Sequence, residues 1–401
     1  MCNFAPGEAI AFGRLSLLAE FPERDFPGIF NIVPLASSNE EAEVAETLYD
    51  DFGFLHVTDI PEGREIEVVS KLSADFGHLV SNGDISVDLN YFLPRANPAF
   101  MKNSLPDLRL SKPAREWANS IQRHLGRRLQ GSIRPVAVLD SGVAASKLGG
   151  RPIRQLDFSN GRDGVDEIEP TDSRGHGTRV ASILHAALPS NVPIVSARIG
   201  DADREVTVLN VARAFASTVV NYMPAVFNIS LAPLDDTFVC PNCGEVVKVP
   251  AFHSRILRNV FALANDTFVV MASGNSGQNC NDRHLDETTP NLVFAVSVGS
   301  DLGPTEYSSF TDSLAETDSA VCAFGGDDQH FENGYGMFEV SREDVGTSYA
   351  APLVTASIYA SVIEHLEYGE TLDRESVLHR HHHTKSSGWY PDWRPLRRDW
   401  Y

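Results

Sequence analysis

The hydrophobic pattern divides this chain into two parts. In the first part, residues 37–52 (SSNEEAEVAETLYDDF) and 64–83 (REIEVVSKLSADFGHLVSNG) carry apolar residues at the spacing of an amphipathic helix. Residues 84–93 (DISVDLNYFL) instead alternate between apolar and polar positions, which is typical of a half-buried strand. These patterns predict a small mixed α/β unit that ends near residue 92.

In the second part, apolar runs of strand length alternate with runs of helix length. Residues 112–129 carry a proline near their start and have the spacing of an amphipathic helix. The strands expected after it are residues 133–142, 192–200, 225–232, 267–275 and 292–299, and the expected helices are residues 176–188, 205–222 and 346–366. Strands that alternate with helices predict an α/β domain with a mostly parallel sheet.

Between the two parts, residues 93–110 are rich in proline and polar residues, which is typical of a linker. We therefore expect a small α/β N-terminal domain at 1–92, a linker at 93–110, a large α/β domain at 111–370 and a tail at 371–401. The tail contains the run HRHHH at residues 379–383, which is a candidate metal-binding run but reads mainly as a solvated segment.

Composition narrows the range of functions. The 401 residues carry a formal net charge of −21. A surface that binds nucleic acid needs positive charge to meet the phosphates, so this composition argues against nucleic-acid binding. The N-terminus lacks the pattern of a signal peptide, and no apolar run is long enough to span a bilayer. The five cysteines are few and odd in number, so a disulfide scaffold is not expected. We expect a cytoplasmic protein that binds neither nucleic acid nor membranes.

Three short segments carry the side chains of a nucleophilic reaction. They are VLDSGV around Asp140, RGHGTRVAS around His176 and GTSYAAP around Ser348. A serine hydroxyl needs an adjacent base, a histidine takes and returns its proton, and a carboxylate holds the imidazole in one tautomer. Glycines on both sides of His176 permit a close approach of the backbone. Singly, each residue is better explained by a structural role, as a turn or cap residue or, for His176, as a partly buried polar group, and only the combination indicates catalysis.

Together with VVMASGNSG around Asn275, these segments resemble the signature segments of the subtilisin-like serine peptidases, the subtilase family, over about residues 111–370. The resemblance implies a subtilisin-like three-layer α/β domain with a mostly parallel sheet, and the hydrophobic pattern places the small α/β N-terminal domain before it. It implies that Ser348 is the nucleophile and His176 the general base and acid. It also implies that Asp140 orients the histidine and that Asn275 donates a hydrogen bond to the oxyanion.

The resemblance further implies how a peptide substrate is held. An extended peptide would form main-chain hydrogen bonds with two segments, one at residues 198–201 and one at residues 230–232. The predicted walls of the primary specificity pocket are Ser230, Leu231, Ala232, Ala272, Ser273 and Gly274. The small residues among them leave room for a medium or large side chain of the substrate.

A pair of cysteines lies outside this catalytic set. The stretch CPNCGE contains Cys240 and Cys243, and the stretch GQNCNDRHLDE adds Cys280 and His284 after the opposite wall of the pocket. These four side chains suit a closed, structural zinc site, with His253 as a substitute fourth ligand. Free thiols, a disulfide and a redox dithiol are the alternatives. A redox pair usually precedes a helix, whereas EVVKVP after this pair reads as a strand.

We interpret the chain as an intracellular serine endopeptidase that cleaves a protein or peptide substrate through an acyl-enzyme. Secreted relatives in the family are usually held by an N-terminal prodomain. Residues 1–92 occupy that position without matching the family's prodomain pattern, and we expect them to restrain or target the peptidase, together with a regulatory protein partner. The alternative is a catalytically silent module that binds peptides on a subtilase domain. The intact set of Asp140, His176, Ser348 and Asn275 argues against this alternative.

Overall fold

The computed structural model describes most of the chain. The described residues are 4–19, 28–35, 51–61, 63–82, 84–93, 108–125, 133–159, 166–167, 171–200, 206–231, 235–239, 246–250, 255–264, 266–275, 277, 289–303, 305–309, 320–327, 334–339 and 344–383. None of the helices within these ranges is long and apolar enough to cross a membrane.

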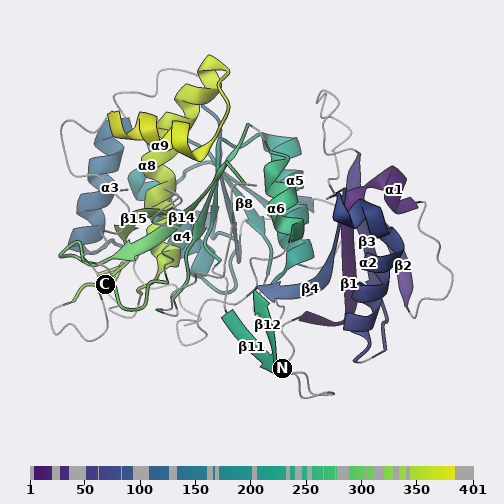
Figure 1. The fold of residues 1–401 in the computed structure, drawn as a ribbon. Helices are drawn as coiled ribbons and strands as arrows, with labels where there is room; N and C mark the ends of the chain where they lie inside the picture. Colours follow the sequence, from purple (N-terminus) through teal and green to yellow (C-terminus); the bar gives the residue numbers. More distant parts are fainter. Residues whose placement is uncertain are drawn as a thin grey trace.

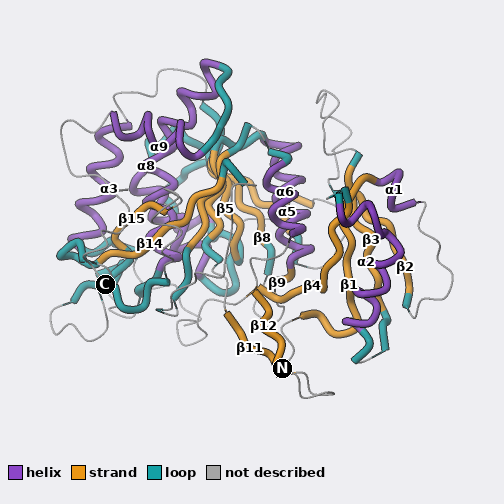
Figure 2. Tube along the Cα trace, viewed as in Figure 1, coloured by secondary structure: helices purple, strands orange, loops and turns teal. Residues whose placement is uncertain are grey.

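A central sheet of eight strands forms the core of the larger part of the molecule (Figures 1 and 2). Its strand order is β15-β14-β13-β10-β5-β8-β6-β7, and all neighbours are parallel except β6 and β7. The strands are β5 (Val136–Asp140), β6 (Ile153–Asp157), β7 (Asp166–Glu167), β8 (Ile194–Arg198), β10 (Val226–Ile229), β13 (Phe268–Ala272), β14 (Leu292–Val298) and β15 (Ala320–Phe324). The predicted mostly parallel sheet is therefore confirmed.

Helices cover both faces of this sheet, because successive side chains of a strand point to opposite sides. In β5, Val136 and Val138 belong to a core with one group of helices, whereas Ala137 and Leu139 belong to a core with the other group. The first group is α3 (Lys112–Leu125), α4 (His176–Ala187), α8 (Thr347–Tyr368) and α9 (Arg374–His383), and the second is α5 (Val208–Tyr222) and α6 (Arg255–Ala262). The three-layer α/β architecture is confirmed, and the alternation directs Asp140 toward α4 and α8.

Four strands of a smaller antiparallel sheet precede the central sheet in sequence, and the fifth, β9, comes between two strands of the central sheet. The strand order of the smaller sheet is β2-β3-β1-β4-β9. Its elements are β1 (Phe4–Arg14), α1 (Leu15–Ala19), β2 (Ile29–Pro34), β3 (Phe52–Thr58), α2 (Glu65–Ser81), β4 (Ile85–Leu93) and β9 (Val206–Thr207). The predicted helix at 64–83 and strand at 84–93 are confirmed as α2 and β4. The helix expected at 37–52 lies mostly outside the described residues, but its last residue, Phe52, begins β3 and stacks on Phe12 of β1.

Both faces of the N-terminal sheet are apolar. Ala9 and Ala11 of β1 pack in a core with α2, whereas Ile10 and Phe12 belong to the same core as α5 and α6. Figure 1 shows α5 and α6 between the central sheet and the N-terminal sheet. β4 also pairs with β9, which directly precedes α5. The N-terminal part therefore shares a hydrophobic core with the larger part.

Two short segments differ from the sequence-based expectation. Residues 205–222 are expected to form one helix, but Val206 and Thr207 form β9, and Thr207 Oγ1 caps α5 by accepting the N–H of Asn210 at 3.2 Å. Within the expected tail, residues 374–383 form α9, and two of its apolar side chains, Val377 and Leu378, are buried in the core of α3, α4 and α8. Two apolar residues are too few to give α9 a clear helical pattern in the sequence.

Candidate active site

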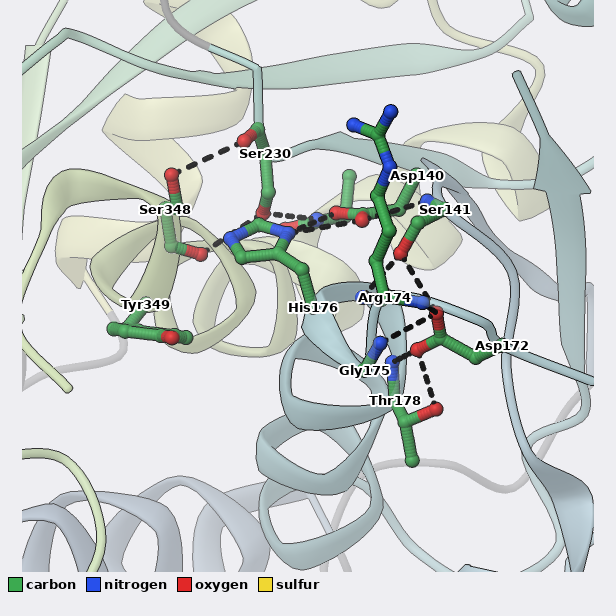
Figure 3. Close-up of polar contacts among 12 residues, drawn as sticks. Asp140, Ser141, Asp172, Arg174, Gly175, His176, Thr178, Ser230, Ser348 and Tyr349 are labelled. Atoms are coloured by element: carbon green, nitrogen blue, oxygen red, sulfur yellow. Dashed lines mark hydrogen bonds and ion pairs between the residues drawn. The ribbon is translucent and has the colours of Figure 1, made fainter. Parts of the chain in front are cut away.

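The carboxyl end of β5 and the N-terminus of α4 bring an aspartate and a histidine into contact. Asp140 is the last residue of β5 and is 3 % exposed, and His176 is the first residue of α4. His176 Nδ1 lies 2.9 Å from both Oδ1 and Oδ2 of Asp140 (Figure 3). Nδ1 carries the proton of the neutral imidazole and donates a hydrogen bond to the carboxylate. Nε2 is therefore left as a proton acceptor.

Gly177 allows this close contact. A Cβ atom at this position would lie 2.2 Å from the carbonyl oxygen of Gly142 and 3.0 Å from Cβ of Asp140. Because no side chain fits in that space, the first turn of α4 lies directly against the end of β5. Gly175, on the other side of the histidine, has a φ of 77°, in the left-handed region that favours glycine. The two glycines of the GHG segment therefore place His176 against Asp140.

The environment of His176 acts on its pKa in opposing directions. Burial lowers the pKa, whereas the charge and the hydrogen bond of Asp140 raise it, and the charge of Asp172 acts in the same raising direction. The net result is a pKa above the ordinary value for histidine. The Asp140 carboxylate thus stabilises the imidazolium that forms when His176 accepts a proton.

A second carboxylate, from Asp172, holds the N-terminus of α4. Its oxygens accept the backbone N–H groups of Gly175 and Thr178, both at 2.8 Å, and the hydroxyl group of Ser141 at 2.9 Å. These bonds satisfy donors that the first turn of a helix leaves without intrahelical partners. Asp172 is absent from the predicted site, because it lies three residues before the N-cap residue of α4, Gly175, where the sequence gives no capping signal.

Ser348 lies on the opposite side of the histidine. It is the second residue of α8, and Figure 3 shows the His176 ring between Asp140 and Ser348. Ser348 Oγ donates to the backbone carbonyl oxygen of Ser230 at 3.1 Å, and among the contacts of the described residues none is a hydrogen bond from Ser348 to His176. Catalytic hydrogen bonds are often long or misaligned in an enzyme without substrate. The structure therefore brings the three predicted residues together, with the serine hydroxyl on a different acceptor.

The side-chain amide of Asn275 is oriented by the residue that precedes Ser348. Asn275 Oδ1 accepts the backbone N–H of Thr347 at 2.8 Å and its hydroxyl group at 3.0 Å. Two donors facing one end of the amide identify that end as the oxygen, so Nδ2 points away from Thr347. Thr347 was not among the predicted site residues, although it is part of the GTS segment.

The residues predicted to wall a substrate pocket follow two neighbouring strands. β10 and β13 are paired, so Ser230 and Leu231 after β10 lie beside residues 272–274 at the end of β13. The hydroxyl group of Ser230 is used inside the fold, where it donates to the carbonyl oxygen of Ser348 at 2.9 Å. Ala232 lies outside the described residues. The pocket itself stays a prediction.

The predicted zinc site falls on a part of the chain that the structure does not describe. Its four ligands are Cys240, Cys243, Cys280 and His284. The strand expected after the cysteine pair is confirmed as β12 (Val246–Pro250), which pairs with β11 (Asp235–Val239). Within the described ranges, no group of three or more His, Cys, Asp or Glu side chains is arranged to hold a metal ion. Cys322 is buried in the core of β15. Zinc binding stays a prediction.

Comparisons with known proteins give one family and a set of similar structures. The sequence profile of the subtilase family matches residues 134–386. The chain is similar to the prenylagaramide maturation protease PagA (17 % identity, TM-score 0.42, covering 63 % of this chain and 83 % of that chain). It is similar to the self-cleaved protease domain of PatA (22 % identity, TM-score 0.42, covering 66 % of this chain and 91 % of that chain). It is also similar to the nisin leader peptidase NisP from Lactococcus lactis (15 % identity, TM-score 0.45, covering 70 % of this chain and 95 % of that chain). No curated protein matches the chain.

Proposed function

The chain belongs to the subtilase family of serine proteases, and we propose that it is an endopeptidase whose catalytic triad consists of Asp140, His176 and Ser348. The observation that carries the proposal is the contact of His176 Nδ1 with both carboxylate oxygens of Asp140 at 2.9 Å. A histidine that is held at one ring nitrogen offers the other nitrogen to a nucleophile. The position of the ring between Asp140 and Ser348 supports this assignment (Figure 3).

In the proposed reaction, Ser348 first exchanges the Ser230 carbonyl for His176 Nε2 as its hydrogen-bond acceptor by rotation about its Cα–Cβ bond. Nε2 takes the hydroxyl proton while Oγ attacks the carbonyl carbon of the scissile peptide bond. His176 then gives this proton to the leaving amine, the C–N bond breaks, and an acyl-enzyme remains. Water, deprotonated by the same ring, attacks the acyl carbon, and Ser348 regains its proton as the acid product leaves.

Two donors are available to the negatively charged oxygen of the tetrahedral intermediate. Asn275 Nδ2 is one, because Thr347 holds the oxygen end of the amide. The backbone N–H of Ser348 is the other, because the first turn of a helix leaves its N–H groups without intrahelical acceptors. Donors that are fixed in advance stabilise the transition state more than the substrate, since the charge on the oxygen develops only there.

The proposed substrate is an extended peptide. β10, β5 and β8 are neighbours in the central sheet, so residues 198–201 and 230–232 follow strands on either side of Asp140. Ligands of parallel sheets bind beyond the carboxyl ends of the strands. A peptide between these two segments would form main-chain hydrogen bonds with both and present its scissile bond to Ser348.

The proposal assigns residues 1–92 the role of restraining or targeting the peptidase. Side-chain hydrogen bonds support a close attachment in addition to the pairing of β4 with β9. Asn90 Oδ1 accepts the N–H of Leu209 at 3.2 Å in the first turn of α5, and Asn259 Nδ2 of α6 donates to Ser86 Oγ of β4 at 2.8 Å. β9 follows the expected substrate-binding segment in the chain, so movement of the N-terminal sheet would act on the peptide-binding side of the domain.

A cytoplasmic location and a structural zinc ion complete the proposal. Five cysteines, an odd number, give little basis for a disulfide scaffold of the kind found in secreted proteins. Zinc bound by Cys240, Cys243, Cys280 and His284 would tie together the segments that follow β10 and β13. Metal analysis that finds no zinc in the purified protein, with stability unchanged in chelator, would end this part of the proposal.

Hydrolysis of an unstructured protein such as casein tests the proposed function. We expect the full chain to cleave it, and Ser348→Ala to lose activity by about 10⁶-fold, the magnitude known for the nucleophile of subtilisin. Circular dichroism and thermal unfolding establish that the variant is folded. Peptide binding without cleavage, both by the unsubstituted chain and by a variant in which the attachment of the N-terminal part is weakened (Asn90→Ala with Asn259→Ala), would favour the catalytically silent module instead.

A further inference from the structure

A chain of buried polar side chains runs from α8 through β10 to the carbonyl group of Ser348. Thr355 Oγ1 of α8 donates to Asn228 Oδ1 at 3.2 Å, and Asn228 Nδ2 donates to Ser230 Oγ at 2.8 Å. Ser230 Oγ in turn donates to the backbone carbonyl oxygen of Ser348 at 2.9 Å. Thr355 and Asn228 are both 0 % exposed. Buried polar groups are costly unless they are paired, so this chain of four residues has to be maintained as a unit.

The direction of every hydrogen bond in this chain is determined. The Ser348 carbonyl can only accept, so the single proton of the Ser230 hydroxyl group points at it. Ser230 Oγ therefore accepts from the NH₂ end of the Asn228 amide, and the oxygen end of that amide accepts from Thr355. Asn228 reaches α8 because Val226 and Asn228 lie on the same side of β10, and Val226 belongs to the core that includes α8.

The carbonyl oxygen of Ser348 needs this donor because of Pro352. In a regular helix, the C=O group of one residue accepts the N–H of the residue four positions later. For Ser348 in α8 that residue is Pro352, which has no N–H. The first turn of α8 therefore lacks its usual bond at the nucleophile, and the hydroxyl group of Ser230 supplies a replacement from the neighbouring strand.

We propose that Ser230 is a positioning residue for the nucleophile, oriented by Asn228 and Thr355, and that it fixes the first turn of α8 where Pro352 leaves the Ser348 carbonyl without a helical partner. The inference rests on the proposed function of Ser348. Ser348 Oγ also donates to the Ser230 carbonyl oxygen at 3.1 Å, so each serine hydroxyl group donates a hydrogen bond to the backbone carbonyl of the other serine. Fixing this turn fixes the position of the nucleophile and the direction of its backbone N–H toward the oxyanion.

A rescue experiment tests this role in the full chain, with the rate constant of labelling by a fluorophosphonate probe as the readout. Ser230→Ala removes the donor and should slow labelling by about 10- to 100-fold, the cost of a misplaced reacting group. Pro352→Ala alone should change the rate little, because Ser230 still supplies the bond. The double variant should label faster than Ser230→Ala, because residue 352 then carries an N–H for the Ser348 carbonyl. A double variant as slow as Ser230→Ala would overturn the proposal.

Two further variants separate positioning from stability. Thr355→Val keeps the shape of the side chain but removes the donor to Asn228, and it should reduce kcat for peptide hydrolysis several-fold with little change in KM. Asn291 provides the matched control: it is a buried asparagine near the start of β14, and its Nδ2 donates to three backbone carbonyl oxygens, including that of Thr267 at 2.8 Å. Asn291→Ala should lower the melting temperature and leave the labelling rate of the folded protein unchanged.

The outcomes distinguish this inference from the proposed function. If the unsubstituted chain does not label and does not cleave peptides, the assignment of Ser348 as nucleophile fails, and the positioning role fails with it. If the probe labels the unsubstituted chain, and labels Ser230→Ala and Thr355→Val as fast as the unsubstituted chain, only the positioning role is wrong. An equal loss of rate in Asn291→Ala would show that the effect follows stability, and would also overturn the inference.

Discussion

At the scale of single residues, each proposed reacting group is held by a neighbour from another part of the chain. The carboxylate of Asp140, at the end of a strand, holds the ring of His176 at the start of a helix. The backbone and hydroxyl groups of Thr347 hold the amide of Asn275. Such neighbours determine the protonation state and orientation of a reacting group before the substrate arrives, which reduces the reorganisation needed during the reaction.

The pH dependence of catalysis should report the pairing of Asp140 with His176. Because His176 has to be neutral to accept a proton, kcat/KM should rise with pH through its pKa, and Asp140 raises that pKa above the ordinary value. Asp140→Asn should lower kcat by about 10⁴-fold, as in other serine proteases. Its residual activity should rise at a lower pH than that of the unsubstituted enzyme. A pH profile that keeps the same midpoint in Asp140→Asn would contradict the assigned pair.

Substitution of Asn275 should affect the transition state and leave substrate binding nearly unchanged. Asn275→Ala removes the Nδ2 donor, and kcat should fall by about 10²- to 10³-fold, the loss known for the oxyanion asparagine of subtilisin. KM should stay close to its original value, because the oxygen carries the full charge only in the transition state. Thr347→Val keeps the amide but removes its hydroxyl partner, so a smaller loss is expected. An equal change in KM and kcat for Asn275→Ala would argue against the oxyanion role.

At the scale of elements, we expect one carboxylate at the N-terminus of α4, that of Asp172, to contribute both to stability and to the proposed catalysis. Asp172→Ala removes the acceptor for two N–H groups of the first turn and should lower the free energy of unfolding by about 1–2 kcal/mol. It also removes a charge that raises the pKa of His176, so the acidic limb of kcat/KM should move to lower pH. Asp172→Asn keeps an oxygen acceptor. It should therefore move the acidic limb of the kcat/KM profile to lower pH with a smaller loss of stability. Unchanged pH profiles in both variants would contradict the electrostatic part of this role.

The sequence predicts these elements well where the signal is local. The strands that end at Asp140 and Ile229, and the helices that begin at His176 and Thr347, follow from apolar runs of the right length and from glycine-flanked motifs. Contacts between distant residues have no such signal. The bond of Ser230 to the Ser348 carbonyl depends on the pairing of β10 with the layer of α8. Likewise, β9 exists only because β4 lies beside it, since two residues have no strand pattern of their own.

At the scale of the whole molecule, the N-terminal sheet and the larger part are joined through a common core. Ile10, Phe12 and Phe54 on one face of the small sheet belong to the same core as Phe215 of α5 and Phe261 of α6. Removal of the N-terminal part would expose this apolar surface on both sides. A restraining domain attached in this way has to open through a change at the interface, because simple detachment would leave a large hydrophobic surface in water.

Weakening this interface should change both the amide hydrogen exchange of its strands and the peptidase activity. Asn90→Ala with Asn259→Ala removes a partner of the Leu209 N–H and a partner of Ser86, which should cost about 1–3 kcal/mol for each buried group left unpaired. Amide hydrogen exchange should accelerate in β4 and β9, and kcat/KM for a peptide should rise if the N-terminal part restrains the enzyme. Arg64→Ala, which removes an exposed ion pair with Glu67, is the control and should change neither quantity. Faster exchange without any change in activity, specificity or partner binding would count against a regulatory role.

The most direct test of the central claim is covalent labelling of the full chain by a fluorophosphonate probe, followed by peptide mapping with mass spectrometry. We predict one equivalent of adduct, located on Ser348, with no labelling of Ser348→Ala and strongly reduced labelling of His176→Ala. An adduct on a different serine, or no adduct in folded preparations of both the full chain and its Asn90→Ala/Asn259→Ala variant, would contradict the account.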